Sequence, residues 1–299
     1  MRLSNFTFLL WASLCLLCSG IGCSNSSTYE PLWSPPQQTD PEEPEEPDDV
    51  SFVVYNHLAD SPDVNVSTVW EVTLSQNGVE KECMVFQSTC PVYDPSKGMI
   101  GSDRTALELV AGRTISWANF SFDGEVTVTA RILDPSRVPM SSSVAVYPSR
   151  KHVSPSLSGQ SVTFTLTEPG QYSVEVGAEG YRNGLMIFAN PLEKDAPKSD
   201  DAAYRRVENA TAADMAALPA DRSGIYFARG VHDIGKYIVP AHVKNIYIPG
   251  DAYVYGTLVV ENNPGVRIFG RGTLSAARLP YRASHSIEAT GDSNGLVVE

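Results

Sequence analysis

The sequence predicts an all-β protein, with an antiparallel β-sandwich over residues 50–190 followed by the first rungs of a parallel β-helix over residues 224–299. Two observations predict this order. Polar and apolar residues alternate with period two through the first part, as they do in half-buried strands. In the second part, short β-branched segments and glycines recur at a fixed spacing, which indicates a solenoid.

The first 22 residues are predicted to be an export signal. Arg2 supplies a positive start, and the apolar stretch "FTFLLWASLCLL" (6–17) follows it. As a helix this stretch spans about 18 Å, which is too short for the ~30 Å core of a bilayer. The next residues, "SGIGC" (19–23), resemble the lipobox of bacterial lipoproteins. That resemblance implies that Cys23 becomes the first mature residue and carries a lipid. An ordinary signal peptide with an incidental cysteine is the alternative.

Residues 23–49 are predicted to be an extended Pro/Glu-rich tether. Its end, "TDPEEPEEPDD" (39–49), holds seven of the chain's acidic residues and no basic one, so much of the formal net charge of −13 is concentrated here. Proline and like charges keep such a segment extended. With Cys23, it predicts a protein lipid-anchored in the bacterial cell envelope, at the outer membrane or cell surface. The sequence has no basic stripe, so nucleic acid is excluded as a partner.

The sandwich is predicted from strands that recur between turns. In "EVTVTARIL" (125–133), valines alternate with threonines. In "SVTFTLTEPGQYSVEVG" (161–177), two alternating runs flank Pro169-Gly170, which predicts a hairpin. Similar pieces occur at "SFVVYNHL" (51–58), "TVWEVTLS" (68–75) and "RTISWANFSF" (113–122), and together they favour an antiparallel β-sandwich.

Two cysteines, Cys83 and Cys90, lie in the sandwich part. In an oxidising compartment they are spaced to close a small disulfide loop, and two free thiols are the alternative. The cysteines and the scattered histidines show no metal-ligand spacing, so the sequence predicts neither a metal site nor a cofactor.

Residues 191–223 interrupt the strand pattern and are predicted to be a linker with one short helix. The helix is expected from Thr211 to Pro219, because Thr211 and Asp214 resemble a capping box.

The β-helix is predicted from three segments that align at one fixed offset: "YFARGVHDIG" (226–235), "IYIPGDAYVYG" (246–256) and "VRIFGRGTLSA" (266–276). The leucine-rich pattern of another solenoid class is absent, so each repeat is interpreted as one rung. The offset aligns three sets of residues: Gly230, Gly250 and Gly270; Ala228, Ile248 and Ile268; Ile234, Val254 and Leu274. The final "SNGLVVE" (293–299) reads as the start of another rung, so we expect the β-helix to be truncated at Glu299.

Several of these segments, in their order, resemble the junction region of glycoside hydrolase family 49, the dextranases and isopullulanases. They are the aligned repeats together with "AVYPSR" (145–150), "VTFTLTEPGQYSVEV" (162–176) and "LMIFANPLE" (185–193). The resemblance implies a β-sandwich packed on a right-handed parallel β-helix, and inverting hydrolysis of a polysaccharide by aspartates on later rungs. Bacterial polygalacturonase-like proteins, closer to family 28, share similar "FANP" and "GVH" segments, so α-glucan and pectin-like substrates both stay open.

No residue of this sequence is assigned as catalytic. Positions on neighbouring rungs and strands lie about 5 to 7 Å apart, so a β-helix can hold carboxylates at the ~6.5 to 9.5 Å that an inverting pair needs. The resemblance places those aspartates beyond residue 299. Asp233 is expected at a corner, and the pairs Asp48-Asp49 and Asp200-Asp201 are expected to be solvated. The carboxylates of the β-helix part are Asp233, Asp251, Glu261, Glu288, Asp292 and Glu299.

Aromatic residues also lie on the predicted rung strands: Tyr247, Tyr253, Tyr255 and Phe269. Because they alternate with apolar residues, some must face outward, where they stack on sugar rings or pack against the sandwich; we rank packing first. The sequence thus predicts the N-terminal part of an exported, lipid-anchored polysaccharide hydrolase that is inactive by itself. The alternatives are a non-catalytic carbohydrate-binding or adhesion lipoprotein, and a polygalacturonase or polysaccharide lyase on the same fold.

Overall fold

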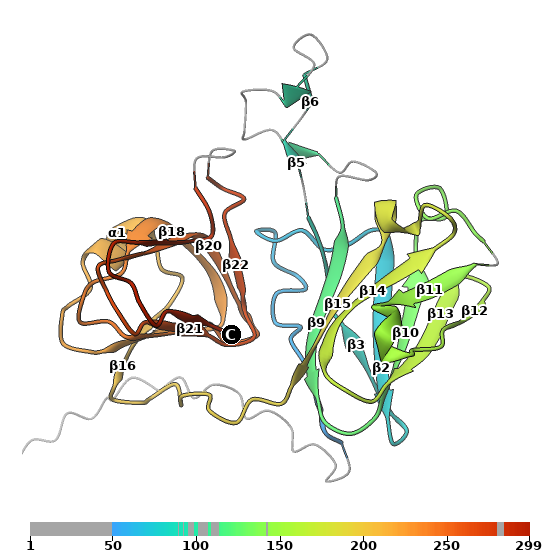
Figure 1. Cartoon of the computed structure of the whole chain (residues 1–299), viewed down its shortest axis with the longest axis horizontal. Helices are drawn as coiled ribbons and strands as arrows, with labels where there is room; N and C mark the ends of the chain where they lie inside the picture. Colours follow the sequence, from blue (N-terminus) through green and yellow to red (C-terminus); the bar gives the residue numbers. More distant parts are fainter. Residues whose placement is uncertain are drawn as a thin grey trace, which may run out of the picture. The chain divides into compact units, whose positions relative to one another are not determined.

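The computed structural model describes residues 50–299, apart from residues 89, 92, 95–98, 101–106, 109–113, 142 and 280–283 (Figure 1). The predicted export signal, Cys23, the tether and the pair Asp48-Asp49 lie outside the described residues. Within the described part, no helix has the length and apolar character needed to cross a membrane.

The first sheet of the sandwich has five strands in the order β12-β13-β10-β2-β3, and every pair is antiparallel. The alternation of valine and threonine along β10 places the valines in the core and the threonines on the outer face. The strands are β2 (Trp70–Gln76), β3 (Val79–Cys83), β10 (Val126–Ile132), β12 (Ser156–Ser158) and β13 (Ser161–Leu166).

The second sheet has the order β1-β9-β15-β14-β11, and β4 also pairs with β9. Its strands β9 and β15 are parallel, which departs from the antiparallel pattern expected of the sandwich. A parallel pair needs a long connection. Here the chain between β9 and β15 supplies it, because this part forms β10, β12 and β13 of the first sheet and β11 and β14 of the second. The strands are β1 (Phe52–Val54), β4 (Val85–Gln87), β9 (Ser116–Phe122), β11 (Val144–Tyr147), β14 (Gly170–Val176) and β15 (Leu185–Pro191).

The predicted hairpin at Pro169-Gly170 is wrong. Both strands form where the alternation places them, but β13 pairs with β10 and β12, whereas β14 pairs with β11 and β15 in the other sheet. The turn therefore carries the chain across the core from one sheet to the other. An alternating pattern marks which face of a strand is buried, and either sheet of a sandwich can bury that face.

The short helix is confirmed, and it ends at Ala216 rather than at Pro219. Helix α1 (Ala212–Ala216) begins with a capping box, in which the Thr211 hydroxyl accepts from the Asp214 N–H and the Asp214 carboxylate accepts from the Thr211 N–H at 2.8 Å. Among the described residues outside the β-helix, the further elements are η1 (Ser149–Lys151), η2 (Gly180–Asn183), β5 (Cys90–Pro91), β6 (Tyr93–Asp94), β7 (Met99–Ile100) and β8 (Leu107–Glu108).

The two cysteines of this part are not bonded to each other in the described structure. Cys83 ends β3 inside the sandwich core, and burial raises the pKa of its thiol to about 12. Cys90 begins β5, outside that core cluster.

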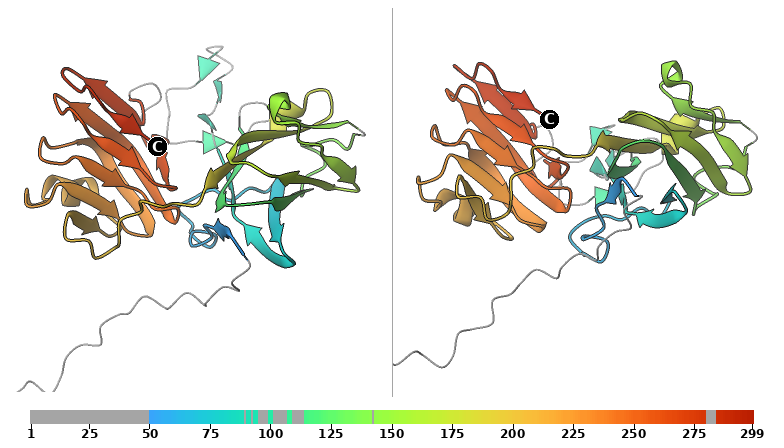
Figure 2. Two further views of the ribbon diagram at one scale, coloured as in Figure 1. Left: turned by 60° about the horizontal axis from the view of Figure 1, so that its bottom comes forward. Right: turned by 90° about the horizontal axis from the view of Figure 1, so that it is seen from below.

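The second part is a parallel β-helix, whose stacked strands can be followed in Figure 2. One sheet has the order β16-β17-β19-β21-β24; the other has the order β18-β20-β22, and β23 pairs with the second half of β20. The strands are β16 (Tyr204–Val207), β17 (Gly224–Phe227), β18 (Gly230–Ile238), β19 (Asn245–Tyr247), β20 (Ala252–Glu261), β21 (Arg267–Phe269), β22 (Thr273–Ser275), β23 (Ile287–Thr290) and β24 (Val297–Val298).

The spacing of the rungs varies, which corrects the constant offset predicted from the sequence. Ile246 pairs with Ile225 of the preceding rung and with Ile268 of the next, so the offset grows from one rung to the next. Val254 pairs with Leu274 as predicted, but its partner on the other side is His232 and not Ile234. The turns differ in length and the ladder is irregular between Asp233 and Gly235, so one fixed offset cannot follow every rung. The predicted alignments of Gly230 with Gly250 and of Ile248 with Ile268 are wrong for the same reason, because Gly230 pairs with Ala252 and Ile268 pairs with Ile246.

His232 is buried in the first rung, with 1% of its surface exposed. Its Nδ1 accepts a hydrogen bond from the Ala210 N–H at 3.0 Å, which leaves Nε2 to donate to the Ala228 carbonyl at 2.8 Å. This pattern needs the neutral imidazole. Burial accordingly lowers the pKa of His232 below its ordinary value.

Acidification is therefore expected to destabilise the protein through His232. In the unfolded chain His232 has the ordinary pKa of about 6.5 and therefore binds a proton more readily than in the folded protein. The contribution of His232 to the free energy of unfolding is complete above about pH 6.5 and is lost as the pH falls below that value. Calorimetry should show a larger fall in Tm between about pH 7 and pH 5 for the wild type than for His232→Gln. Equal falls would show that His232 is not the group responsible.

Candidate functional site

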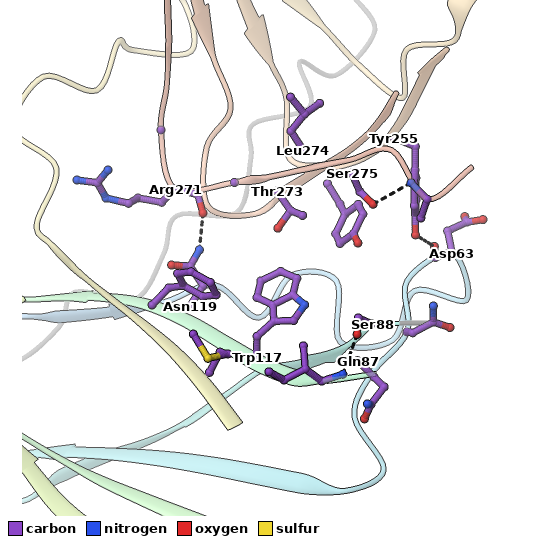
Figure 3. A pocket seen from close by; sticks show the side chains of 18 of the residues that line it. Asp63, Gln87, Ser88, Trp117, Asn119, Tyr255, Arg271, Thr273, Leu274 and Ser275 are labelled. Carbon is purple, nitrogen blue, oxygen red and sulfur yellow. Dashed lines mark hydrogen bonds between the residues drawn. The ribbon is translucent and has the colours of Figure 1, made fainter. Parts of the chain in front are cut away.

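The described residues from Val50 onward belong to one compact unit, in which the outer face of a sandwich sheet and the β-helix border a cavity of about 750 Å³ that is open to solvent (Figure 3). The sandwich side comes from β9 and β15, with Gln87 at the end of β4 and Asp63 and Asn65 from the segment before β2. The β-helix side comes from β20, β22 and the segment after β22. This cavity is the candidate site because its volume lies within the ~300 to 1,000 Å³ of ligand pockets, and because ring and polar side chains line it together.

The sandwich wall follows from the alternation of side chains along two neighbouring strands. On β9, Trp117 and Asn119 point out of the core, whereas Ala118 between them is fully buried. On β15, Met186 and Phe188 point to the same side, since Met186 pairs with Trp117 and Phe188 with Asn119. The outer face of this sheet thus presents large rings and amides to the cavity.

Trp117 is held by rings from two other strands. Phe86 on β4 stacks on it with centroids 4.2 Å apart and planes at 14°, and Phe188 meets it edge-on at 6.1 Å. The ring centroid of Phe86 in turn lies 5.7 Å from the ring centroid of Tyr253 of the β-helix. These contacts fix the indole plane, because each neighbour packs in one of the preferred geometries of aromatic pairs.

Amide hydrogen bonds join the two walls at one end of the cavity. Asn119 Nδ2 donates to the carbonyl of Arg271, and Asn119 Oδ1 accepts from Asn190 Nδ2 at 2.7 Å. The Arg271 guanidinium in turn donates to the Pro191 carbonyl at 3.3 Å. The sandwich is therefore tied to the turn before β22 by contacts in both directions.

At the other end, Arg278 forms a charged cluster with residues from three segments. Its guanidinium lies 4.0 Å from the ring centroid of Tyr255 and forms ion pairs with Asp63 at 3.2 Å and Asp233 at 3.0 Å. The Tyr255 hydroxyl donates to the Asp63 carbonyl at 2.7 Å, and burial raises the pKa of Tyr255. The predicted corner residue Asp233 thus contributes an ion pair.

The rung aromatics divide into two groups. Tyr253 and Tyr255 line the cavity. Tyr247 and Phe269 instead continue a row of rings that starts at Tyr226. The ring centroids of Tyr226 and Tyr247 are 5.2 Å apart, and those of Tyr247 and Phe269 are 5.1 Å apart. The Tyr247 hydroxyl donates to Glu193 at 3.0 Å, and burial raises the pKa of the Glu193 carboxyl. Packing therefore accounts for Tyr247 and Phe269. In the cavity pair, Tyr253 is half-buried, and Tyr255 is buried with Arg278 against its ring.

The remaining carboxylates of the β-helix part have structural contacts or face solvent. Glu288 on β23 accepts from Lys236 at 2.8 Å and from Ser284, contacts that lower its pKa to about 2. The others are Asp251, which accepts from the His57 N–H; Asp292, which accepts from Asn294; Glu299, which pairs with Arg267; and the exposed Glu261. Asp200 and Asp201 are also exposed.

Comparison with known proteins identifies relatives of the chain. It is 22% identical over 268 residues to a dextranase from Arthrobacter globiformis, an alignment that covers 75% of this chain and 42% of the dextranase. The chain is a relative of dextranases. The fold of this dextranase relative is similar to that of Dex49A from Penicillium minioluteum, with a TM-score of 0.58 and 16% identity over 79% of this chain and 54% of that one. No family model matches the sequence.

These findings confirm the predicted relation to the dextranases of glycoside hydrolase family 49 and the predicted fold class. The dextranase relative spans about half the length of the proteins that it matches. Among its described residues, no group of three or more His, Cys, Asp or Glu side chains is placed to hold a metal ion.

Sequence reasoning missed Trp117, Asn119 and Arg278 as lining residues. A signal for the first two is present, because a tryptophan on the solvent-facing side of an alternating strand has no place in the core. Arg278 has no comparable signal, since it lies in the excursion between β22 and β23 and meets Asp63 from more than 200 positions away.

Proposed function

We propose that this chain is the N-terminal part of an exported, lipid-anchored polysaccharide hydrolase of the inverting, dextranase-like type, acting on an α-glucan. The observation that carries the proposal is the alignment with a dextranase over 75% of the chain. The similar fold of Dex49A supports it. The anchor would be Cys23, and the location the bacterial cell envelope.

The acids that cleave the substrate would lie on further rungs of the complete enzyme. Within the described β-helix residues, the carboxylates either serve ion pairs and hydrogen bonds or face solvent, and none is paired with another across a cleft. An inverting enzyme needs two carboxyl groups about 6.5 to 9.5 Å apart with room for a water molecule. The role of residues 50–299 would be to start the solenoid and cover its first rungs.

The test compares residues 1–299 with the product of the reading frame extended beyond codon 299. We expect the extended protein to release reducing sugar from dextran, with inverted anomeric configuration seen by NMR at early times, and residues 1–299 to release none. Hydrolysis by residues 1–299, or no hydrolysis of any α-glucan by the extended protein, would refute the proposal.

Anchoring has a separate test. Cys23→Ser is expected to move the protein from the membrane fraction to the soluble fraction and to abolish labelling by a radioactive fatty acid, because the thiol that would carry the lipid is gone. Ser24→Ala is the matched control and should stay in the membrane. A wild-type protein that is itself soluble and unlabelled would leave an ordinary signal peptide as the explanation.

One observation favours a second candidate function, a non-catalytic carbohydrate-binding lipoprotein. The described residues form a ring-lined cavity but hold no arranged catalytic pair. Saccharide binding without hydrolysis by the extended protein would support this alternative.

A further inference from the structure

We propose that the cavity between β9, β15 and β22 is a binding subsite for a neutral oligosaccharide, and that Trp117 is its stacking platform. The class of ligand rests on the proposed function. The location and the residues come from the structure of the cavity.

The first argument is the state of the Trp117 ring. Phe86 covers one face of the indole and is not among the residues that line the cavity, so the surface that Trp117 contributes to the lining lies away from Phe86. The ring is half-buried and is held on its side by Phe188. A fixed aromatic plane exposed to a cavity suits the apolar C–H face of a pyranose, because the face of the ring is the negative part of its quadrupole.

The second argument is the kind of polar group around this ring. The lining includes the amides of Gln87 and Asn190 and the hydroxyls of Thr273 and Ser275. Amides and hydroxyls both donate and accept hydrogen bonds, as sugar hydroxyls do. Part of this capacity is used within the protein, since Gln87 Oε1 accepts from Ser67 and Ser116 and Asn190 Nδ2 donates to Asn119. An apolar ligand would offer no hydrogen bond to the capacity that remains, and burying a polar group without a partner is unfavourable. A polyhydroxylated ligand can supply those hydrogen bonds.

The third argument is charge. The lining has two cations and carboxylates close to them. Arg278 forms ion pairs with Asp63 and Asp233. The Arg271 guanidinium donates to the Pro191 carbonyl, and its charge opposes the rise that burial causes in the pKa of Glu193. The lining that the structure describes therefore has no excess of positive charge with which to bind an anionic ligand. A neutral glucan fits this lining better than a polyuronate does.

The test measures binding of isomaltotriose and of trigalacturonate to the full 299-residue chain by calorimetry. We expect isomaltotriose to bind, trigalacturonate to bind more weakly or not at all, and Trp117→Ala to weaken isomaltotriose binding about tenfold or more, an effect of about 1.4 kcal/mol. Trp117→Phe should retain part of the affinity because it keeps a smaller ring. Tyr181→Ala is the matched control, since Tyr181 is 58% exposed and does not line the cavity.

Circular dichroism of each variant establishes that it is folded. Thr273→Val replaces the hydroxyl with a methyl group at nearly unchanged volume, and we expect this variant to bind isomaltotriose more weakly. The proposal is overturned if folded wild-type chain binds no isomaltotriose, if Trp117→Ala and Thr273→Val bind it as tightly as wild type, or if trigalacturonate binds more tightly. Dextran hydrolysis by the extended protein is read independently. Hydrolysis without binding by the 299-residue chain removes only the subsite, and binding without hydrolysis removes only the hydrolase.

Discussion

Replacing Trp70 with alanine is expected to lower the free energy of unfolding by about 3 to 5 kcal/mol. Trp70 starts β2 with 1% of its surface exposed, and it is among the largest fully buried side chains of the sandwich. Its indole N–H donates to the carbonyl of Asn183 at 2.8 Å. The substitution therefore leaves a cavity and also removes the hydrogen-bond partner of a carbonyl, and both effects destabilise the folded state.

The measurement is urea unfolding followed by circular dichroism, with Trp117→Ala as the matched control. Trp117 is also a β-strand tryptophan, but it is half-buried on the outer face of the sheet. We expect that variant to lose about 1 kcal/mol, since less apolar surface returns to water. If the two variants lose the same stability, Trp70 does not have the central position in the core that the structure assigns to it.

Replacing Gly256 with alanine is expected to destabilise the β-helix by about 3 kcal/mol or more. Gly256 has a φ of +138°, in a region that L-residues rarely adopt, and it pairs with Gly235 of the preceding rung. A Cβ at this position would lie 2.3 Å from the Gly235 carbonyl oxygen and 2.6 Å from Ile234 Cγ1. Because the oxygen belongs to the backbone of a stacked strand, the rungs must separate to relieve the overlap.

Gly265→Ala separates the effect of the positive φ from the effect of the overlap with the neighbouring rung. Gly265 also has a positive φ, +72°, but none of the described atoms beyond its chain neighbours lies within 4 Å of a Cβ built there. That variant should show only backbone strain, about 1 kcal/mol. Chemical unfolding of both variants measures the difference. A Gly256→Ala protein as stable as Gly265→Ala would mean that the rungs are not packed as closely as described.

Local patterns were sufficient to predict the elements themselves. Alternating apolar residues placed Val126 and Val128 in the core, and the capping residues Thr211 and Asp214 located the one short helix of the linker. These predictions hold because they depend on neighbours in the chain: a strand has period two, and a cap satisfies N–H groups within one turn. The aligned pair Val254 and Leu274 belongs to the same class, since the rung between them has the length that the repeat predicts.

Predictions about partners between strands were less successful. The residues of the turn at Pro169-Gly170 do not determine whether the next strand pairs with the preceding one or joins the opposite sheet. The parallel pairing of β9 with β15 depends on a long connection between these two strands. The unequal offsets between stacked rungs likewise follow from turn lengths that differ from one rung to the next. These strand pairings and rung offsets depend on how side chains pack across the whole domain.

The same division applies to the candidate site. The sequence determined that the protein is all-β, that a solenoid follows a sandwich, and that its relatives are dextranases, because periodicity and motif segments are properties of the chain itself. Only the tertiary structure decided that Trp117, Asn119, Tyr255 and Arg278 share one cavity. The physical reason is that the cavity exists where the outer face of one folded part meets another, and that meeting brings together residues more than 150 positions apart.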